Sequence, residues 1–249
     1  GGIVPHAGWV CSGAVAAKVF AAIRLRRKPA TFVIFGAVHY LGGDQATIFP
    51  AGAWRTPLGE VRVDEQLARW VLSMTGLIIE DPYAHEREHS IEVQVPFIQH
   101  LFPEASILPI GVPPSDDAAE VGRAVARAIR TYSVDAVCIG STDLTHYGPS
   151  YGYVPKGIGE SALRWAMEVN DRRILDLIVA LRAEQIVAEA RESHNACGAG
   201  ATAAAVAACS ELGASRGILL EHTNSYQVLR RISPEPPRDA VGYAAVVFG

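Results

Sequence analysis

The feature that most constrains the fold is a repeated alternation of short apolar, β-branched runs with helical stretches. Such alternation builds a largely parallel sheet covered on both faces by helices. The predicted strands are Gly2–Val4, Thr31–Gly36, Ser106–Val112, Asp135–Gly140, Arg216–Glu221 and Val241–Phe248. We therefore predict an α/β fold of three layers with a central, mostly parallel sheet.

Capping residues indicate where several helices begin. Ser12 precedes Gly13–Ile23, Asp64 precedes Glu65–Thr75, Ser115 precedes Asp116–Tyr132, and an Ala-rich helix covers Gly198–Leu212. Two regions depart from the alternation. Ala46–Val63 contains the sequence Thr-Pro-Leu-Gly at 56–59, which predicts a turn between two short strands, and Ile158–Arg191 is predicted to be helical.

Composition narrows the class of protein. The 249 residues are 49% hydrophobic and carry a formal net charge of -4, which predicts one domain over residues 1–249 and no nucleic-acid partner. The apolar runs fall short of the roughly 18 to 20 residues that span a bilayer, so no membrane partner is expected. Four cysteines without a paired spacing indicate a reducing compartment, and we predict a cytoplasmic protein.

Three histidines follow the carboxyl ends of predicted strands: His6, His39 and His146. Ligands bind at that edge of open α/β sheets. A single histidine in such a place is usually an ordinary loop residue, but three at equivalent places favour a shared metal pocket. The small residues Ala7, Gly8, Gly36 and Ala37 beside them permit close approach of a ligand.

Cys197 lies at the predicted start of the Ala-rich helix. The helix dipole and the unpaired N–H groups there favour thiolate over thiol, and a thiolate is a metal ligand or a nucleophile. The alternative is a small buried residue, the usual fate of a cysteine. Cys11, Cys138 and Cys209 are assigned to the core.

The segment His85-Glu86-Arg87-Glu88-His89 matches the H-E-x-x-H pattern of zinc peptidases. The helix is predicted to break near Pro96 and no third ligand follows, so a peptidase is the less favoured interpretation. We expect His89 and Glu92 to share a helix face directed into the histidine pocket. His85 should be partly exposed, and positions 86–88 should form a solvated face.

Six motifs occur in an order that resembles the Memo-like family, whose prokaryotic members are also called AmmeMemoRadiSam system protein B. They are Pro5-His6-Ala7-Gly8-Trp9, Gly36-x-x-His39, Thr56-Pro57-Leu58-Gly59, Glu88-His89-Ser90-Ile91-Glu92, Ser141-Thr142-Asp143-Leu144-Thr145-His146-Tyr147-Gly148 and Ala196-Cys197-Gly198. This resemblance implies the fold of the LigB-like extradiol dioxygenases, which use non-haem iron. The chain departs from the family at Tyr40 and Cys11, and we expect the family's N-terminal segment before the first motif to be missing here, which bears on the completeness of the pocket but not on its ligands.

The resemblance also implies roles for individual residues. His6, His39 and Cys197 match the metal ligands, with Cys197 where the dioxygenases have a carboxylate. His146 matches the pocket residue that resembles their acid/base group. His89, Glu92 and Asp143 match other pocket positions that contact substrate or support the ligands.

A ligand set of two histidines and a cysteine is softer than two histidines and a carboxylate. The resemblance implies iron (Fe2+) as the first expectation for the metal, and the softer donor set leaves copper and zinc as alternatives. The predicted function is dioxygenase-type or other redox chemistry on a small substrate. The alternative is a non-catalytic protein whose pocket holds a metal or a peptide. Family association suggests functional partners of radical-SAM or AMMECR-like type.

Overall fold

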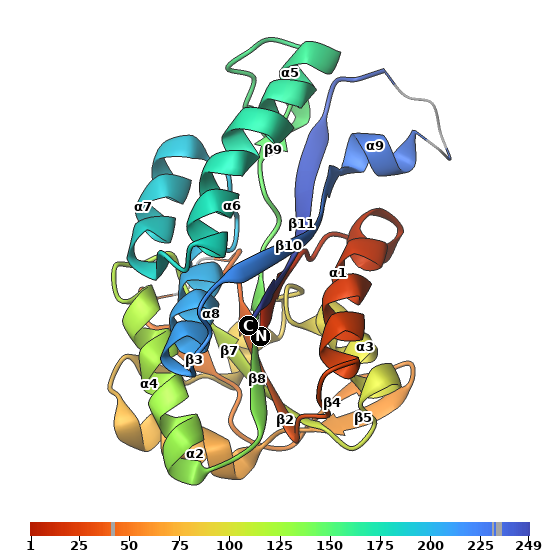
Figure 1. The fold of residues 1–249 in the computed structure, drawn as a ribbon. Coiled ribbons are helices and arrows are strands. Elements are labelled where there is room, and N and C mark those ends of the chain that lie inside the picture. The colour runs from red at the N-terminus through yellow and green to blue at the C-terminus, as the bar shows by residue number, and fades with distance from the viewer. Residues whose placement is uncertain (41–42, 231, 233–235) are drawn as a thin grey trace.

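The computed structural model describes residues 1–40, 43–230, 232 and 236–249. Within this part of the chain, a mixed sheet has the strand order β10-β11-β1-β8-β2-β7-β3-β6, and β9 pairs with β11 (Figure 1). The strands of this sheet are β1 (Gly2–Val4), β2 (Thr31–Gly36), β3 (Ala46–Ile48), β6 (Ile78–Glu80), β7 (Ser106–Gly111), β8 (Ala136–Ser141), β9 (His146–Tyr147), β10 (Gly217–Asn224) and β11 (Ala240–Phe248).

Four adjacent strands at the centre, β1, β8, β2 and β7, run parallel. The sequence of β2, Thr-Phe-Val-Ile-Phe-Gly, is buried at every position, as expected for a strand covered on both faces. Parallel strands bring their carboxyl ends to one edge of the sheet. The segments that follow β1, β2 and β8 therefore meet there, although they are far apart in the sequence.

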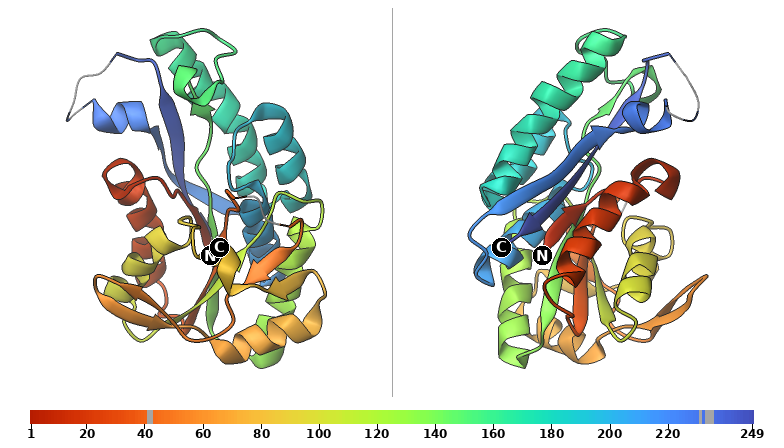
Figure 2. Two further views of the ribbon diagram at one scale, coloured as in Figure 1. Left: turned by 180° about the vertical axis from the view of Figure 1, so that it is seen from behind. Right: turned by 45° about the vertical axis from the view of Figure 1, so that its right-hand side comes forward.

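Helices cover both faces of the sheet (Figures 1 and 2). One layer holds α2 (Glu65–Met74), α4 (Ala118–Tyr132), α6 (Asp171–Val179), α7 (Ala183–Ser193) and α8 (Ala199–Glu211). The other holds α1 (Trp9–Arg24), α3 (Val95–Leu101) and α9 (Ser225–Leu229). A further helical stretch consists of α5 (Glu160–Trp165) and a π-helical turn, Ala166–Asn170, which leads into α6.

Close packing in the first layer depends on Gly122 of α4. A Cβ atom at this position would lie 2.0 Å from the carbonyl oxygen of Ala204 in α8. The Ala-rich sequence of α8 is buried from Ala199 to Cys209, so that helix is enclosed rather than amphipathic. Small residues on both helices thus let the two backbones approach each other.

The predicted fold class, three layers around a mostly parallel sheet, is confirmed. The predicted turn is also confirmed, because β4 (Ala53–Thr56) and β5 (Gly59–Arg62) form a hairpin in which Thr56 pairs with Gly59. No helix among the described residues combines the length and the apolar character needed to cross a bilayer.

Two predicted helix starts were wrong. The first helix begins at Trp9, and the Ser12 hydroxyl lies inside it, donating a hydrogen bond to the Ala7 carbonyl at 2.8 Å. Its N-cap is Gly8, which provides no side-chain cap. The helix predicted from Asp116 begins at Ala118. A serine that can cap a helix can also hydrogen-bond back to the backbone within it, which explains the first error.

Candidate metal centre

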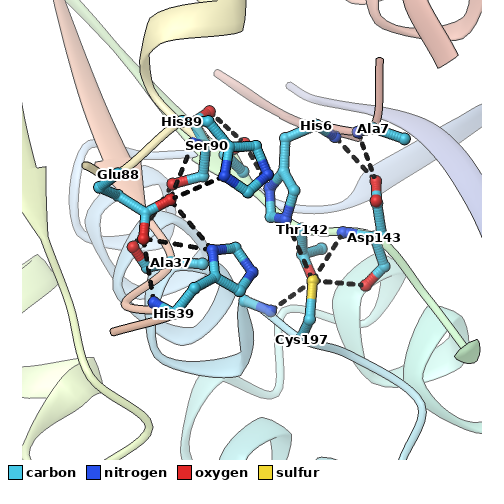
Figure 3. A network of polar contacts seen from close by, with 12 residues as sticks. His6, Ala7, Ala37, His39, Glu88, His89, Ser90, Thr142, Asp143 and Cys197 are labelled. Carbon is cyan, nitrogen blue, oxygen red and sulfur yellow. Dashed lines mark hydrogen bonds and ion pairs between the residues drawn. The ribbon is translucent and has the colours of Figure 1, made fainter. Parts of the chain in front are cut away.

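Three imidazoles meet at the carboxyl edge of the sheet, from His6 after β1, His39 after β2 and His89 in the segment between β6 and α3 (Figure 3). One ligand nitrogen from each lies within 4.8 Å of the other two. The ring centroids of His6 and His39 are 5.1 Å apart, and those of His39 and His89 are 4.9 Å apart. This spacing brings three nitrogen donors close enough to share one cation.

Ser141, at the end of β8, fixes the tautomer of His6. The Ser141 hydroxyl donates to the Ser90 carbonyl at 2.8 Å, so its oxygen accepts from His6 Nδ1 at 2.9 Å. The proton of His6 therefore resides on Nδ1, and the lone pair of Nε2 is directed into the pocket. Burial, followed by the neighbouring His39 and His89, holds the pKa of His6 well below its usual value. His6 is thus a neutral donor at neutral pH.

Glu88 holds His39 in a similar way. His39 Nδ1 donates to the Glu88 carboxylate at 3.0 and 3.2 Å, and the backbone N–H of His39 donates to the same carboxylate at 2.9 Å. This leaves Nε2 of His39 available to a metal. Burial alone would raise the pKa of Glu88, but hydrogen bonds from His39 and Ser90 outweigh it and lower that pKa to about 2. A carboxylate that orients a ligating histidine is a common support for metal sites.

The same carboxylate also faces the third histidine, because His89 Nδ1 lies 3.7 Å from Glu88 Oε1. The His89 side chain is 48% exposed and that of His39 is 28% exposed, whereas Glu88 is 5% exposed. The trio is therefore supported from inside the protein and reachable from solvent. The hydrogen bond to Glu88 raises the pKa of His39, so a metal would compete with a proton at that side chain.

Cys197 lies beside His6 on the opposite side of the cluster from Glu88 (Figure 3), with Sγ 3.1 Å from His6 Nε2. Its sulfur also accepts a hydrogen bond from the Asp143 N–H at 3.3 Å. Two ligands of one tetrahedral metal, bound at about 2.0 and 2.3 Å, are roughly 3.5 Å apart. The sulfur and Nε2 therefore have a separation compatible with a common metal.

The environment of Cys197 differs from the one we expected. The residue precedes the N-cap Gly198 rather than lying in the first turn of α8. Burial, and then the charge of Asp143, raise the pKa of the Cys197 thiol to about 12, which is the opposite of the predicted shift. The burial penalty outweighs any stabilisation by the helix start, so the thiol is protonated unless a metal displaces its proton.

The glycines after Cys197 serve close packing. A Cβ at Gly198 would lie 2.2 Å from the Ser141 carbonyl oxygen, and one at Gly200 would lie 2.2 Å from the Pro113 carbonyl oxygen. Gly198 N–H also donates to the Thr142 hydroxyl at 2.9 Å. These contacts place the start of α8 directly against the end of β8, which is why Cys197 reaches His6.

Asp143 is a buried carboxyl that supports the backbone of the pocket. It accepts the backbone N–H groups of His6 at 2.8 Å and Ala7 at 3.3 Å. Burial raises its pKa to about 6, although these hydrogen bonds and His39 act in the opposite direction. Asp143 thus anchors the loop after β1 that carries His6.

His146 begins β9, where it pairs with Val241 of β11. Its Nε2 is buried and has no hydrogen-bond partner among the described residues, and its ring lies 5.1 Å from that of Tyr151. Burial, and then His39, lower the pKa of His146. The ring is therefore neutral, and one nitrogen is free to accept or donate a proton.

The H-E-x-x-H segment does not form the helix that was predicted. Pro82–His85 is a short 3-10 helix, and His89 lies beyond its end, before a second 3-10 helix at Glu92–Gln94. Because His89 lies outside both helices, the expectation of one helix face shared by His89 and Glu92 is wrong, and Glu92 is exposed. A role for Glu92 in the pocket stays a prediction.

Two further expectations about this segment are wrong. His85 is 6% exposed rather than partly exposed, and it packs against Phe49 and Trp54 instead of joining the trio. Glu88 is buried rather than part of a solvated face. Sequence reasoning missed Glu88 and Ser141 as supports. Both stand in motifs that the chain shares with the family, and Glu88 is directly beside the predicted pocket residue His89.

The fold and this cluster define an α/β protein in which three histidines that could hold a metal ion lie at the carboxyl ends of the parallel strands. The family model for Memo-like protein matches residues 1–247. The chain belongs to the Memo-like protein family, as its motifs predicted.

Relatives of similar sequence include two MEMO1 family proteins. The one from Thermococcus kodakarensis is 40% identical over 254 residues, and the one from Thermococcus onnurineus is 38% identical over 254 residues. Each alignment covers 99% of this chain and 86% of the relative. Among solved structures, an uncharacterized protein from Escherichia coli K12 is similar, with a TM-score of 0.58 and 9% identity over 93% of this chain and 92% of that one. At this identity the likeness concerns the fold alone.

Proposed function

We propose that this protein binds iron or copper through His6, His39 and His89, with the Cys197 thiol as a further donor, and uses the metal for redox chemistry on a small substrate. The observation that carries the proposal is the set of three ligand nitrogens within 4.8 Å of one another. Two of these histidines donate their second ring nitrogen to a fixed acceptor, Ser141 or Glu88, as ligating histidines do.

The donor set fits such a metal. Imidazole nitrogens suit iron, copper and zinc, and a thiolate donor shifts the preference toward softer ions. A redox-active metal bound here would supply electron exchange with an oxidant such as O2. The thiol proton of Cys197 has His6 Nε2 as its nearest acceptor, at 3.1 Å, so a metal has to displace that proton before the sulfur can ligate.

The surrounding residues have separate tasks in this proposal. Asp143 holds the His6 loop through two backbone N–H groups. His146 offers a neutral ring whose Nε2 has no hydrogen-bond partner in the described part of the chain, and this ring can take up or release a proton next to the metal pocket. The partial exposure of His39 and His89 gives a substrate access to the site.

Metal analysis of anaerobically purified protein tests the proposal. We expect about one iron or copper per chain, and Cys197→Ser should weaken binding of copper(I) or iron more than Cys11→Ser, Cys138→Ser or Cys209→Ser. Thermal stability measured on the same four variants separates ligand loss from lost packing. If all four bind metal as the parent does, Cys197 is not a ligand.

Oxygen consumption tests the chemical part. Protein loaded with iron or copper should consume O2 in the presence of a catechol, and His146→Gln should slow this while metal content stays the same. Metal-loaded protein that consumes no O2 with catechols would count against dioxygenase-type chemistry and favour a non-catalytic metal-binding protein.

A further inference from the structure

A cavity of about 320 Å³ lies next to the histidine trio, and none of the three histidines is among its lining residues. Its walls include Val38, immediately before His39, and Glu88, the carboxylate that holds His39. His85, the first histidine of the H-E-x-x-H segment, also lines it. The size is at the lower end of the range usual for small-molecule sites.

Two buried polar side chains line this cavity, Glu88 and the His85 imidazole, and each is 6% exposed. Within the described part of the chain, the His85 ring makes one hydrogen bond, a long one of 3.4 Å between Nε2 and the Thr47 hydroxyl. Burial lowers the pKa of His85 to about 4, so the ring is neutral at physiological pH. A neutral imidazole has one nitrogen that accepts a hydrogen bond and one N–H that donates. His85 can therefore offer a ligand its acceptor nitrogen, alone or together with its N–H donor.

The charged groups of the cavity are mostly anionic. Asp44, Asp81 and Glu86 line it together with Glu88, and Arg87 is the one cationic side chain among the described lining residues. Asp81 uses one oxygen to accept the Ala84 N–H at 3.2 Å. The lining thus carries a surplus of negative charge, which attracts a cation and disfavours an anion.

Aromatic rings complete the lining. Tyr40 is 56% exposed and Tyr83 is 80% exposed, and both border the same cavity. Aromatic faces next to carboxylates are suited to organic cations, because the ring quadrupole attracts positive charge while the ring shields an alkyl stem from water. Ala37, Ile79 and Ala84 add apolar surface for such a stem.

We propose that this His85 cavity is a binding site for an organic cation, a guanidinium or ammonium group on a short alkyl chain. The carboxylates of Asp44 and Glu86 attract the charged head, Tyr40 and Tyr83 border it, and the His85 ring accepts one of its N–H groups. The site is independent of the metal pocket, although Glu88 borders both. A ligand in this cavity would lie beside Glu88, the carboxylate that holds His39.

Butylguanidinium is a suitable probe, and N-butylurea is its uncharged analogue of nearly equal shape. The full chain carries eight histidines, so 13C labelling at histidine Cε1 gives a simple NMR spectrum in which the His85 signal is the one lost in His85→Gln. Titration should be run on the protein as purified and again after chelation of metal. We expect butylguanidinium to shift the His85 signal in both samples and N-butylurea to leave it in place.

Charge variants test the same site. Asp44→Asn combined with Glu86→Gln should weaken butylguanidinium binding about tenfold, because two attractive charges are removed. Glu192→Gln, the same change on α7, should leave the affinity unaltered. Arg87→Gln should strengthen binding, because it removes the competing cation.

Several results would overturn the proposal. These are no shift of the His85 signal, equal binding of N-butylurea, unchanged affinity in the double charge variant, or weaker binding in Arg87→Gln. Binding that disappears only when metal is chelated would assign the probe to the histidine trio instead. A protein that contains no metal but still binds butylguanidinium would refute the proposed function and would support the organic-cation site.

Discussion

His85 and His89 belong to one short motif, yet the fold places their rings in unlike surroundings. His89 is about half exposed, next to two other imidazoles and the Glu88 carboxylate. His85 is buried between Phe49 and Trp54, with the Thr47 hydroxyl as its hydrogen-bond partner. The comparison teaches that the H-E-x-x-H pattern identifies ligands only on a helix, where its two imidazoles share a face. Here the chain turns between them.

The largest difference between the histidine trio and the His85 region should be the loss of metal affinity when a ligand nitrogen is removed. His6→Gln takes one nitrogen from the trio, and we expect metal affinity to fall by more than the roughly 100-fold that loss of a supporting residue can cost. His85→Gln should leave metal stoichiometry as it is in the parent. Metal content per folded chain, measured by elemental analysis, gives the answer. Equal losses in both variants would place His85 in the metal site after all.

Removal of the carboxylate behind the trio should have the next largest effect. Glu88→Gln weakens the orientation of His39, so metal affinity should fall roughly 10- to 100-fold. Glu92→Gln alters a similar side chain that is exposed, and it should change metal affinity less than twofold. Competition titration with a metal indicator measures both. A larger loss in the Glu92 variant would restore that residue to the pocket.

Glycines in register on adjacent strands offer a third contrast. Gly36 of β2 pairs with Gly111 of β7. A Cβ at Gly36 would meet Ile91 at 2.5 Å and the Ser90 hydroxyl at 2.8 Å, whereas one at Gly111 would meet the Thr47 hydroxyl at 2.9 Å and then nothing nearer than 3.6 Å.

We therefore expect Gly36→Ala to lower the free energy of unfolding by about 1 to 3 kcal/mol and to weaken metal binding, because it displaces the segment that carries His89. Gly111→Ala should be less destabilising and should leave metal binding unchanged. Denaturant unfolding and metal titration of both variants test this. A Gly36→Ala variant as stable as the parent would show that residues 89–91 can move away from the added Cβ without loss of stability.

The smallest expected effect concerns Thr47. Thr47→Val keeps the shape of the side chain but removes its hydroxyl, the hydrogen-bond partner of His85. Because that bond is long, we expect a loss of about 1 kcal/mol or less in the free energy of unfolding, with metal content unchanged. Thermal unfolding with elemental analysis measures both quantities. A drop in metal content would mean that the two regions are coupled through Glu88.

Local patterns predicted the strands β1, β2, β7, β8, β10 and β11 of the sheet, but not the short strands β3, β6 and β9. The strand at Thr31–Gly36 was predicted at both ends, because a short continuous run of apolar, largely β-branched and aromatic residues is typical of a strand buried on both faces. The Asp64 cap was also predicted, and its carboxylate accepts the Leu67 N–H at 3.0 Å. Placing His6, His39 and His146 at one edge required only the predicted strand ends and the rule that parallel strands share an edge.

From the residues alone, hydrophobic periodicity predicted the layered fold and the edge at which the histidines gather, because it acts locally and repeatedly along the chain, and the six motifs predicted the family. Only the tertiary structure decided which neighbours each polar group has. Glu88 becomes a support because its segment folds back over β2, and the Cys197 thiol is held in its neutral form because β8 and α8 pack around it. Burial and hydrogen bonding between distant residues set these properties, and no local pattern records them.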